Sequence, residues 1–173
     1  MSTSSPSDAD RLLRQALLAL ETNRPLEALA CFDRALALQP ALAVAMDGRA
    51  QALRRLGRLH EAIDWYGRAL EASPDFAAAL VHRARCHQEM GEDVLALADF
   101  RRALRLQPQR HDWHLACATL LATDDPSAAK AALHEAARCG AAPAQVDFML
   151  AALTGAPPPP LPPASYVSAL FDA

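Results

Sequence analysis

The sequence predicts an all-α fold built from repeated pairs of helices. The 173 residues are rich in Ala and Leu, and aromatic residues make up only 5%, which favours closely packed helices over sheets. Apolar residues follow helical spacing that Gly and Pro interrupt at intervals. The whole pattern returns every 34 residues. We therefore expect a helical solenoid of about four hairpins followed by one capping helix.

Five columns of residues recur in three copies without a gap. Small alanines let the two helices of a hairpin approach closely, and large aromatics fill the space between neighbouring hairpins. A proline ends each second helix because the residue before proline is pushed out of the α region. The columns are Ala28, Ala62 and Ala96; Phe32, Tyr66 and Phe100; Ala35, Ala69 and Ala103; Leu36, Leu70 and Leu104; and Pro40, Pro74 and Pro108.

The turns inside the hairpins are also marked in the sequence. Gly57 and Gly91 stand where a positive φ is needed, and Asn23 takes that place in the first copy. A fourth copy begins near residue 111, and its second helix is expected to start with Asp125 as the N-cap and Pro126 as the first helical residue.

This pattern resembles the tetratricopeptide repeat family, whose unit is a helix-turn-helix of this length. The resemblance implies a right-handed solenoid with repeats at about 9–42, 43–76, 77–110 and 111–142 and a capping helix at 143–154, which Gly155 ends. Leu12, Met46 and Leu80 replace the family's large aromatic near the start of the first helix, and His114 falls in the same core-facing column. We expect residues 1–8 to be disordered and residues 156–173 to be a proline-rich linker with a short apolar tail.

In this family the first helices line a concave groove that usually binds peptides. The resemblance implies a protein or peptide partner, with Arg55 and Arg85 as anchors for a carboxylate. An ordinary solvated face is the open alternative. The expected groove residues are Asp47, Gln51 and Arg55 from the second repeat, Arg85, Gln88 and Glu89 from the third, and Thr119 from the fourth.

One kind of peptide partner is not expected. Family members that bind chaperones grip a C-terminal carboxylate with Lys, Asn and Arg side chains. The matching places here hold Leu13, Leu17, Gly48, Ala78 and His82. The partner is therefore not predicted to be the C-terminal carboxylate motif of a chaperone.

Other chemistry is not indicated, and we expect no metal, no cofactor and no catalytic residue. His111, His114 and Cys117 are spread over about 9 Å of a helix, too far to close around one zinc ion. The arginine clusters lack interleaved aromatics and the net charge is -3, so no nucleic-acid partner is predicted. Without a signal peptide or a bilayer-length apolar run, we expect no membrane partner and a cytoplasmic location. No nucleophile–base pair or glycine-rich phosphate loop indicates an enzyme.

The last stretch, "PPPPLPPASYVSALFDA", raises two alternatives. Its prolines favour a stiff spacer, and Tyr166, Val167, Leu170 and Phe171 could dock within the chain or between chains, so self-association stays open. The segment also resembles the junction at which repeats join a bacterial S-adenosylmethionine-dependent methyltransferase domain. The leading hypothesis is a non-catalytic interaction module. The alternative is the substrate-recruiting region of such a methyltransferase, which sequence beyond Ala173 would distinguish.

Overall fold

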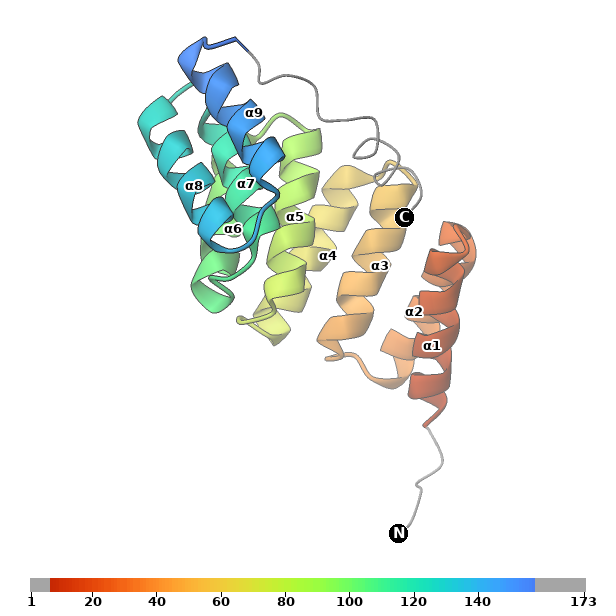
Figure 1. The fold of residues 1–173 in the computed structure, drawn as a ribbon. Coiled ribbons are helices and arrows are strands. Elements are labelled where there is room, and N and C mark those ends of the chain that lie inside the picture. The colour runs from red at the N-terminus through yellow and green to blue at the C-terminus, as the bar shows by residue number, and fades with distance from the viewer. Residues whose placement is uncertain (1–6, 158–173) are drawn as a thin grey trace. The chain divides into compact units, whose positions relative to one another are not determined.

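The computed structural model describes residues 7–157, and within that range the fold is all helical, with nine helices and no strand (Figure 1). This confirms the predicted fold class. The chain divides into two compact units, unit 1 ending at Leu106 and unit 2 beginning at Gln107. Each unit is described below by itself.

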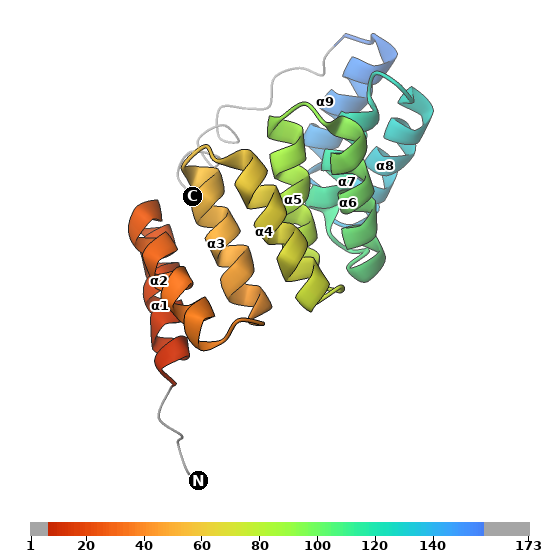
Figure 2. The ribbon, with the colours of Figure 1, turned by 180° about the vertical axis from the view of Figure 1, so that it is seen from behind.

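Unit 1 contains three helical hairpins. Contacts are most extensive within each hairpin, and α2 packs on α3 as α4 packs on α5. The first helices α1, α3 and α5 form one layer, seen from the front in Figure 1, and the second helices α2, α4 and α6 form the other, seen from the front in Figure 2. The hairpins are α1 (Asp8–Glu21) with α2 (Pro25–Leu38), α3 (Ala43–Arg55) with α4 (Leu59–Ala72), and α5 (Ala77–Glu89) with α6 (Asp93–Leu106).

Unit 2 contains one hairpin and one further helix among its described residues. The hairpin joins α7 (His111–Leu121) to α8 (Pro126–Arg138), and α9 (Pro143–Thr154) packs on α8. The core of this unit includes Leu133 of α8 and Val146 of α9, both buried.

The predicted turn and cap residues adopt the expected conformations. Asn23, Gly57 and Gly91 have φ values of 54°, 75° and 74°, in the left-handed region that glycine and asparagine tolerate best. Asp125 caps α8, because its side chain accepts a hydrogen bond of 2.9 Å from the backbone N–H of Ala128.

The second helices end where the prolines predict. α2 ends at Leu38 and α4 ends at Ala72, each two residues before a proline. The intervening residues Gln39 and Ser73 have ψ values of 84° and 90°, outside the α region that a following proline disfavours.

The aromatic column joins each hairpin of unit 1 to the next. Phe32 is completely buried, and its ring lies directly against Gly48 of α3, where no side chain intervenes. Tyr66 holds the same place one repeat later and is also completely buried. Its partner is the imidazole of His82, with ring centroids 5.8 Å apart. The repeats thus share an aromatic position but differ in the residue that receives it.

Two expectations differ from the structure. The first helix begins at Asp8, one residue before the expected start, because Ser7 and Asp10 form a capping box at its N-terminus. His114 does not face the core: it is half-buried, and its Nε2–H donates to the carbonyl of Pro108 at 2.9 Å. The core position belongs to Trp113, which is 4% exposed and buries far more apolar surface than an imidazole would.

Candidate functional site

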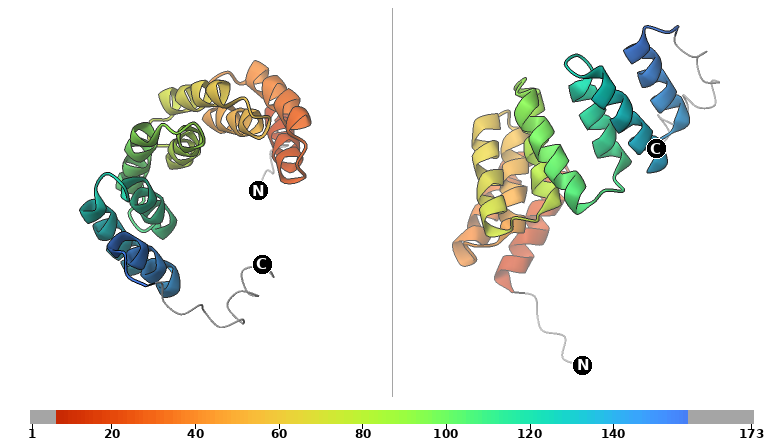
Figure 3. Two further views of the ribbon diagram at one scale, coloured as in Figure 1. Left: turned by 90° about the horizontal axis from the view of Figure 1, so that it is seen from above. Right: turned by 90° about the vertical axis from the view of Figure 1, so that its left-hand side faces the viewer.

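The first helices of unit 1 lie on the inner side of the curve that its hairpins make (Figure 3, left). Residues 34 apart occupy equivalent places on these helices, so Leu17 of α1, Gln51 of α3 and Arg85 of α5 form a strip across the three first helices. Leu17 is 38% exposed, Gln51 is half-buried and Arg85 is exposed. The strip therefore changes from apolar to polar to cationic along the unit.

A polar cluster forms where α3 meets α5. The carboxylate of Asp47 is only 5% exposed. It accepts a hydrogen bond of 2.8 Å from the Nε2 of Gln51 and bonds to the Nδ1 of His82 at 2.9 Å. Two predicted groove residues are thus brought together, but Asp47 bonds both to Gln51 and to His82, which the sequence analysis placed at a position of the chaperone clamp and not among the groove residues.

Two titratable groups near this cluster, the Tyr66 hydroxyl and the Cys86 thiol, are kept in their neutral forms. Burial, reinforced by the nearby charge of Asp47, raises the pKa of the Tyr66 hydroxyl far above its ordinary value. Burial also raises the pKa of the Cys86 thiol to about 11. Neither group is therefore ionised near neutral pH, and neither is poised as a nucleophile.

Arg55, one of the two expected carboxylate anchors, is engaged by the protein itself. Its Nη1 donates to the main-chain carbonyl of Leu20 at the end of α1. Glu89 is engaged as well, since its carboxylate pairs with the Nη1 of Arg54 at 2.6 Å. Both interactions join neighbouring first helices.

A single offset explains these contacts. Asp47 with His82, Arg54 with Glu89, and Leu20 with Arg55 are all separated by 35 residues, one repeat plus one position. A side chain on one first helix therefore reaches the next helix at this offset.

Arg85 is the exception. The offset places Ala50, which has no polar side-chain group, opposite it on α3. Within residues 7–157 the guanidinium of Arg85 makes no hydrogen bond or ion pair with another residue. Gln88, another expected groove residue, lies one turn from Arg85 on α5 and is half-buried. Its side chain likewise makes no hydrogen bond within residues 7–157. Arg85 and Gln88 are thus available to a ligand.

Thr119 belongs to unit 2, whereas the other expected groove residues belong to unit 1. Its hydroxyl donates to the carbonyl of Leu115 one turn earlier, at 3.1 Å. It lines a cavity of about 290 Å³ between α7 and α9, together with Phe148 and Met149.

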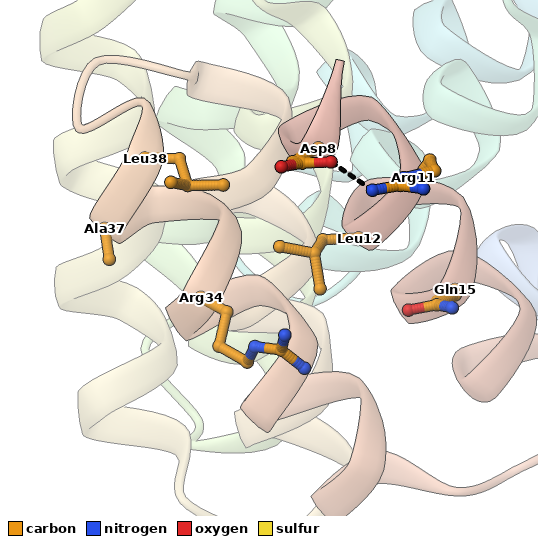
Figure 4. A pocket seen from close by; sticks show the side chains of 7 residues that line it. All are labelled: Asp8, Arg11, Leu12, Gln15, Arg34, Ala37 and Leu38. Atoms are coloured by element: carbon orange, nitrogen blue, oxygen red, sulfur yellow. Dashed lines mark hydrogen bonds and ion pairs between the residues drawn. The ribbon is translucent and has the colours of Figure 1, made fainter. Parts of the chain in front are cut away.

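A larger cavity of about 600 Å³ lies at the outer edge of the first hairpin, between α1 and α2 (Figure 4). Leu12 and Leu38 form its apolar part, while Asp8 and Arg11 pair with each other on one side and Arg34 lies on the other. The sequence did not single out this cavity. Arg34 recurs as Arg68 and Arg102 at the 34-residue period, but this recurrence alone predicts no cavity.

The part of the chain that the structure describes contains no group of three or more His, Cys, Asp or Glu side chains able to hold a metal ion. Nor does that part contain a helix of the length and apolar character needed to cross a membrane.

A family model for the tetratricopeptide repeat matches residues 13–77 and 48–111, which together span more than half of the chain. The chain belongs to the tetratricopeptide repeat family. The matches begin within α1, cover the rest of the three hairpins of unit 1 and extend to the first residue of α7. The tail that resembles a methyltransferase junction lies outside these matches and outside the described residues, as do Tyr166, Val167, Leu170 and Phe171.

Solved tetratricopeptide repeat proteins share the fold. YrrB, described as having an unusual peptide-binding site, matches with a TM-score of 0.74 at 21% identity, covering 86% of this chain and 77% of its own. MamA from Desulfovibrio magneticus matches with a TM-score of 0.77 at 16% identity, covering 87% and 86%. The first such domain of Spaghetti, bound to an HSP90 peptide, matches with a TM-score of 0.63 at 20% identity, covering 65% and 89%. No curated protein sequence matches this chain.

Proposed function

We propose that this tetratricopeptide repeat protein is a non-catalytic interaction module whose unit 1 binds an extended segment of a partner protein along the inner faces of α1, α3 and α5. The observation that carries the proposal is the exposed guanidinium of Arg85, which has no partner among residues 7–157, while Arg55 and Glu89 are already engaged. The peptide-bound Spaghetti domain and the peptide-binding site of YrrB support a peptide as the ligand class.

The chemistry of the strip defines the segment that would fit. Arg85 would bind a carboxylate by charge-assisted hydrogen bonds, and Gln88 offers an amide next to it. Leu17, at the other end, would receive an apolar side chain. Gln51 in the middle keeps its carbonyl oxygen available for a main-chain N–H, because its Nε2 is bonded to Asp47.

The distance between these ends sets the length of the segment. Neighbouring first helices are spaced by about 10 Å, so Leu17 and Arg85 are separated by about 20 Å. An extended chain advances about 3.3 Å per residue. A carboxylate and an apolar side chain about six residues apart would therefore meet both ends of the strip.

The proposal is tested with synthetic extended peptides that carry one Asp or Glu and one Leu or Phe at separations from two to ten residues, measured by fluorescence polarisation. Binding is expected to be strongest near a separation of six. Arg85→Glu is expected to weaken it at least tenfold, because a charge-assisted hydrogen bond contributes about 1.5–3 kcal/mol.

The matched control is Arg101→Glu, which makes the same charge change at an exposed arginine on α6, a second helix. It is expected to leave binding unchanged. Equal losses from both substitutions would show a general charge effect, and unchanged binding by Arg85→Glu would refute the assigned anchor. Failure of every peptide to bind would refute the groove as the binding surface.

A further inference from the structure

Helix α9 ends in the turn that elsewhere leads into another helix. Gly155 has a φ of 66°, and the N–H that follows it donates to a carbonyl five residues back, at 3.0 Å. The same turn at Asn23, Gly57, Gly91 and Gly140 is followed by a new helix within three residues. After Gly155 come prolines, which lack the N–H that a helix interior requires. The sequence therefore disfavours a helix at the usual place.

The register of the repeats shows which side of α9 such a helix would cover. Ala16, Ala50 and Ala84 lie seven residues before the turn residues of α1, α3 and α5, and all three are completely buried. Ala16 belongs to one apolar cluster with Ala28 of α2, the second helix of its hairpin. Phe148 lies seven residues before Gly155, and it is 58% exposed.

The other residues of α9 also indicate that one side of this helix is exposed and apolar. Val146 is its only buried residue and Asp147 its only charged one. The apolar cavity beside Phe148 continues over Ala152 and Leu153 of α9 and reaches Ala122 of α7. An exposed, uncharged apolar face of this kind is rare unless something packs on it.

The sequence supplies a segment that fits this face. Tyr166, Val167, Leu170 and Phe171 are spaced so that a helix would carry them on one side, with Ser168 on the other. Residues 157–164 include six prolines, and eight residues of polyproline II helix are long enough to span about 25 Å. That exceeds the length of α9, about 18 Å for 12 residues. The linker therefore reaches either end of the helix.

We propose that the exposed face of α9 is the docking surface for residues 165–172 of this same chain, in the place where the second helix of a hairpin would lie. The aromatic and aliphatic side chains of the segment contact Phe148. This inference concerns unit 2 and does not depend on the peptide site of unit 1.

Hydrogen exchange of the α9 amides in the full 173-residue chain tests the proposal. Phe171→Asp is expected to raise the exchange rate of these amides at least tenfold, because a charge on the apolar side would release the segment. Ser168→Asp adds the same charge to the opposite side and is expected to change the rate little. The amides of α1–α6 serve as the internal reference.

Three outcomes would overturn the proposal. Unchanged α9 exchange in Phe171→Asp would show that the segment does not cover the helix. A further increase when Phe171→Asp is added to Phe148→Ala would show that the two residues act on different sites. A dimer by light scattering that becomes a monomer in Phe171→Asp would show that the segment packs on a second copy and not on its own chain.

Discussion

Gly48 and Gly67 are both helical glycines of unit 1, yet replacing them with alanine is expected to change stability in opposite directions. In an open helical position Gly→Ala stabilises by about 1 kcal/mol, because alanine loses less conformational freedom on folding. At Gly67 the nearest atom to an added methyl group is the Nη1 of Arg83 at 4.0 Å. Gly67→Ala should therefore gain this amount.

At Gly48 the added methyl group would lie within 3.0 Å of three atoms of the Phe32 ring. That ring is completely buried, so in a closely packed interior it can move only by displacing its neighbours. Overpacking of this kind costs about 3 kcal/mol, the upper part of the usual range. Set against the helical gain of about 1 kcal/mol, the net destabilisation of Gly48→Ala is about 2 kcal/mol.

Urea and thermal unfolding followed by circular dichroism measure both effects. For a unit of this size, 1 kcal/mol corresponds to about 5 °C in Tm, so Gly48→Ala should lower Tm by about 10 °C and Gly67→Ala should raise it by about 5 °C. Combining Gly48→Ala with Phe32→Leu should cost less than the sum of the single changes. Equal effects of the two alanines, or strict additivity with Phe32→Leu, would refute the close contact between Gly48 and Phe32.

Three other predictions concern caps, buried charge and thiols. Ser7→Ala should cost about 1 kcal/mol in the free energy of unfolding, since it removes the side-chain cap of α1, and Ser7→Asp should restore it. Asp99→Ala should cost about 1–3 kcal/mol by urea unfolding, because it removes both hydrogen bonds, 2.7 and 2.8 Å long, to the half-buried Arg83; a loss below 0.5 kcal/mol would contradict a structural role. Burial raises the pKa of Cys86 to about 11, so the folded protein keeps this thiol protonated at a pH where the unfolded chain would lose the proton. The contribution of Cys86 to the free energy of unfolding is therefore fully present below the ordinary pKa of a thiol and is lost as the pH rises towards 11. At pH 8 a thiol reagent should therefore label the half-buried Cys139 faster than Cys86 by mass mapping, and equal rates would contradict the burial.

The fold could be predicted because its determinants are local and repeated. A left-handed turn residue, a proline two positions beyond a helix, and a small residue four positions before an aromatic each act within a few residues of their own position. Gly57, Asp125 and Pro74 therefore adopt the roles expected of them. His114 was placed incorrectly in the core, because the repeat column did not show that the adjacent Trp113 offers a larger apolar surface.

The site was harder to predict, because it depends on contacts between helices. The strip position of Arg85 followed from the 34-residue spacing, but the engagement of Arg55 depends on a carbonyl of another helix. Whether an inner-face charge is free depends on the residue at an offset of 35, as Ala50 shows for Arg85. This offset depends on how neighbouring first helices pack against each other, so it cannot be deduced from the sequence of one repeat.

Because Phe32 and Tyr66 have different partners, the hairpins of unit 1 cannot be exchanged for one another. Deleting residues 43–76 would keep the 34-residue period but bring Phe32 against His82, where an imidazole would occupy the space that Gly48 leaves empty. Duplicating the same segment would place Tyr66 against a glycine and leave its ring without the His82 neighbour. Each junction is thus specific to its own pair of repeats, and recombination between these units of equal length would yield chains with the correct period but mismatched cores.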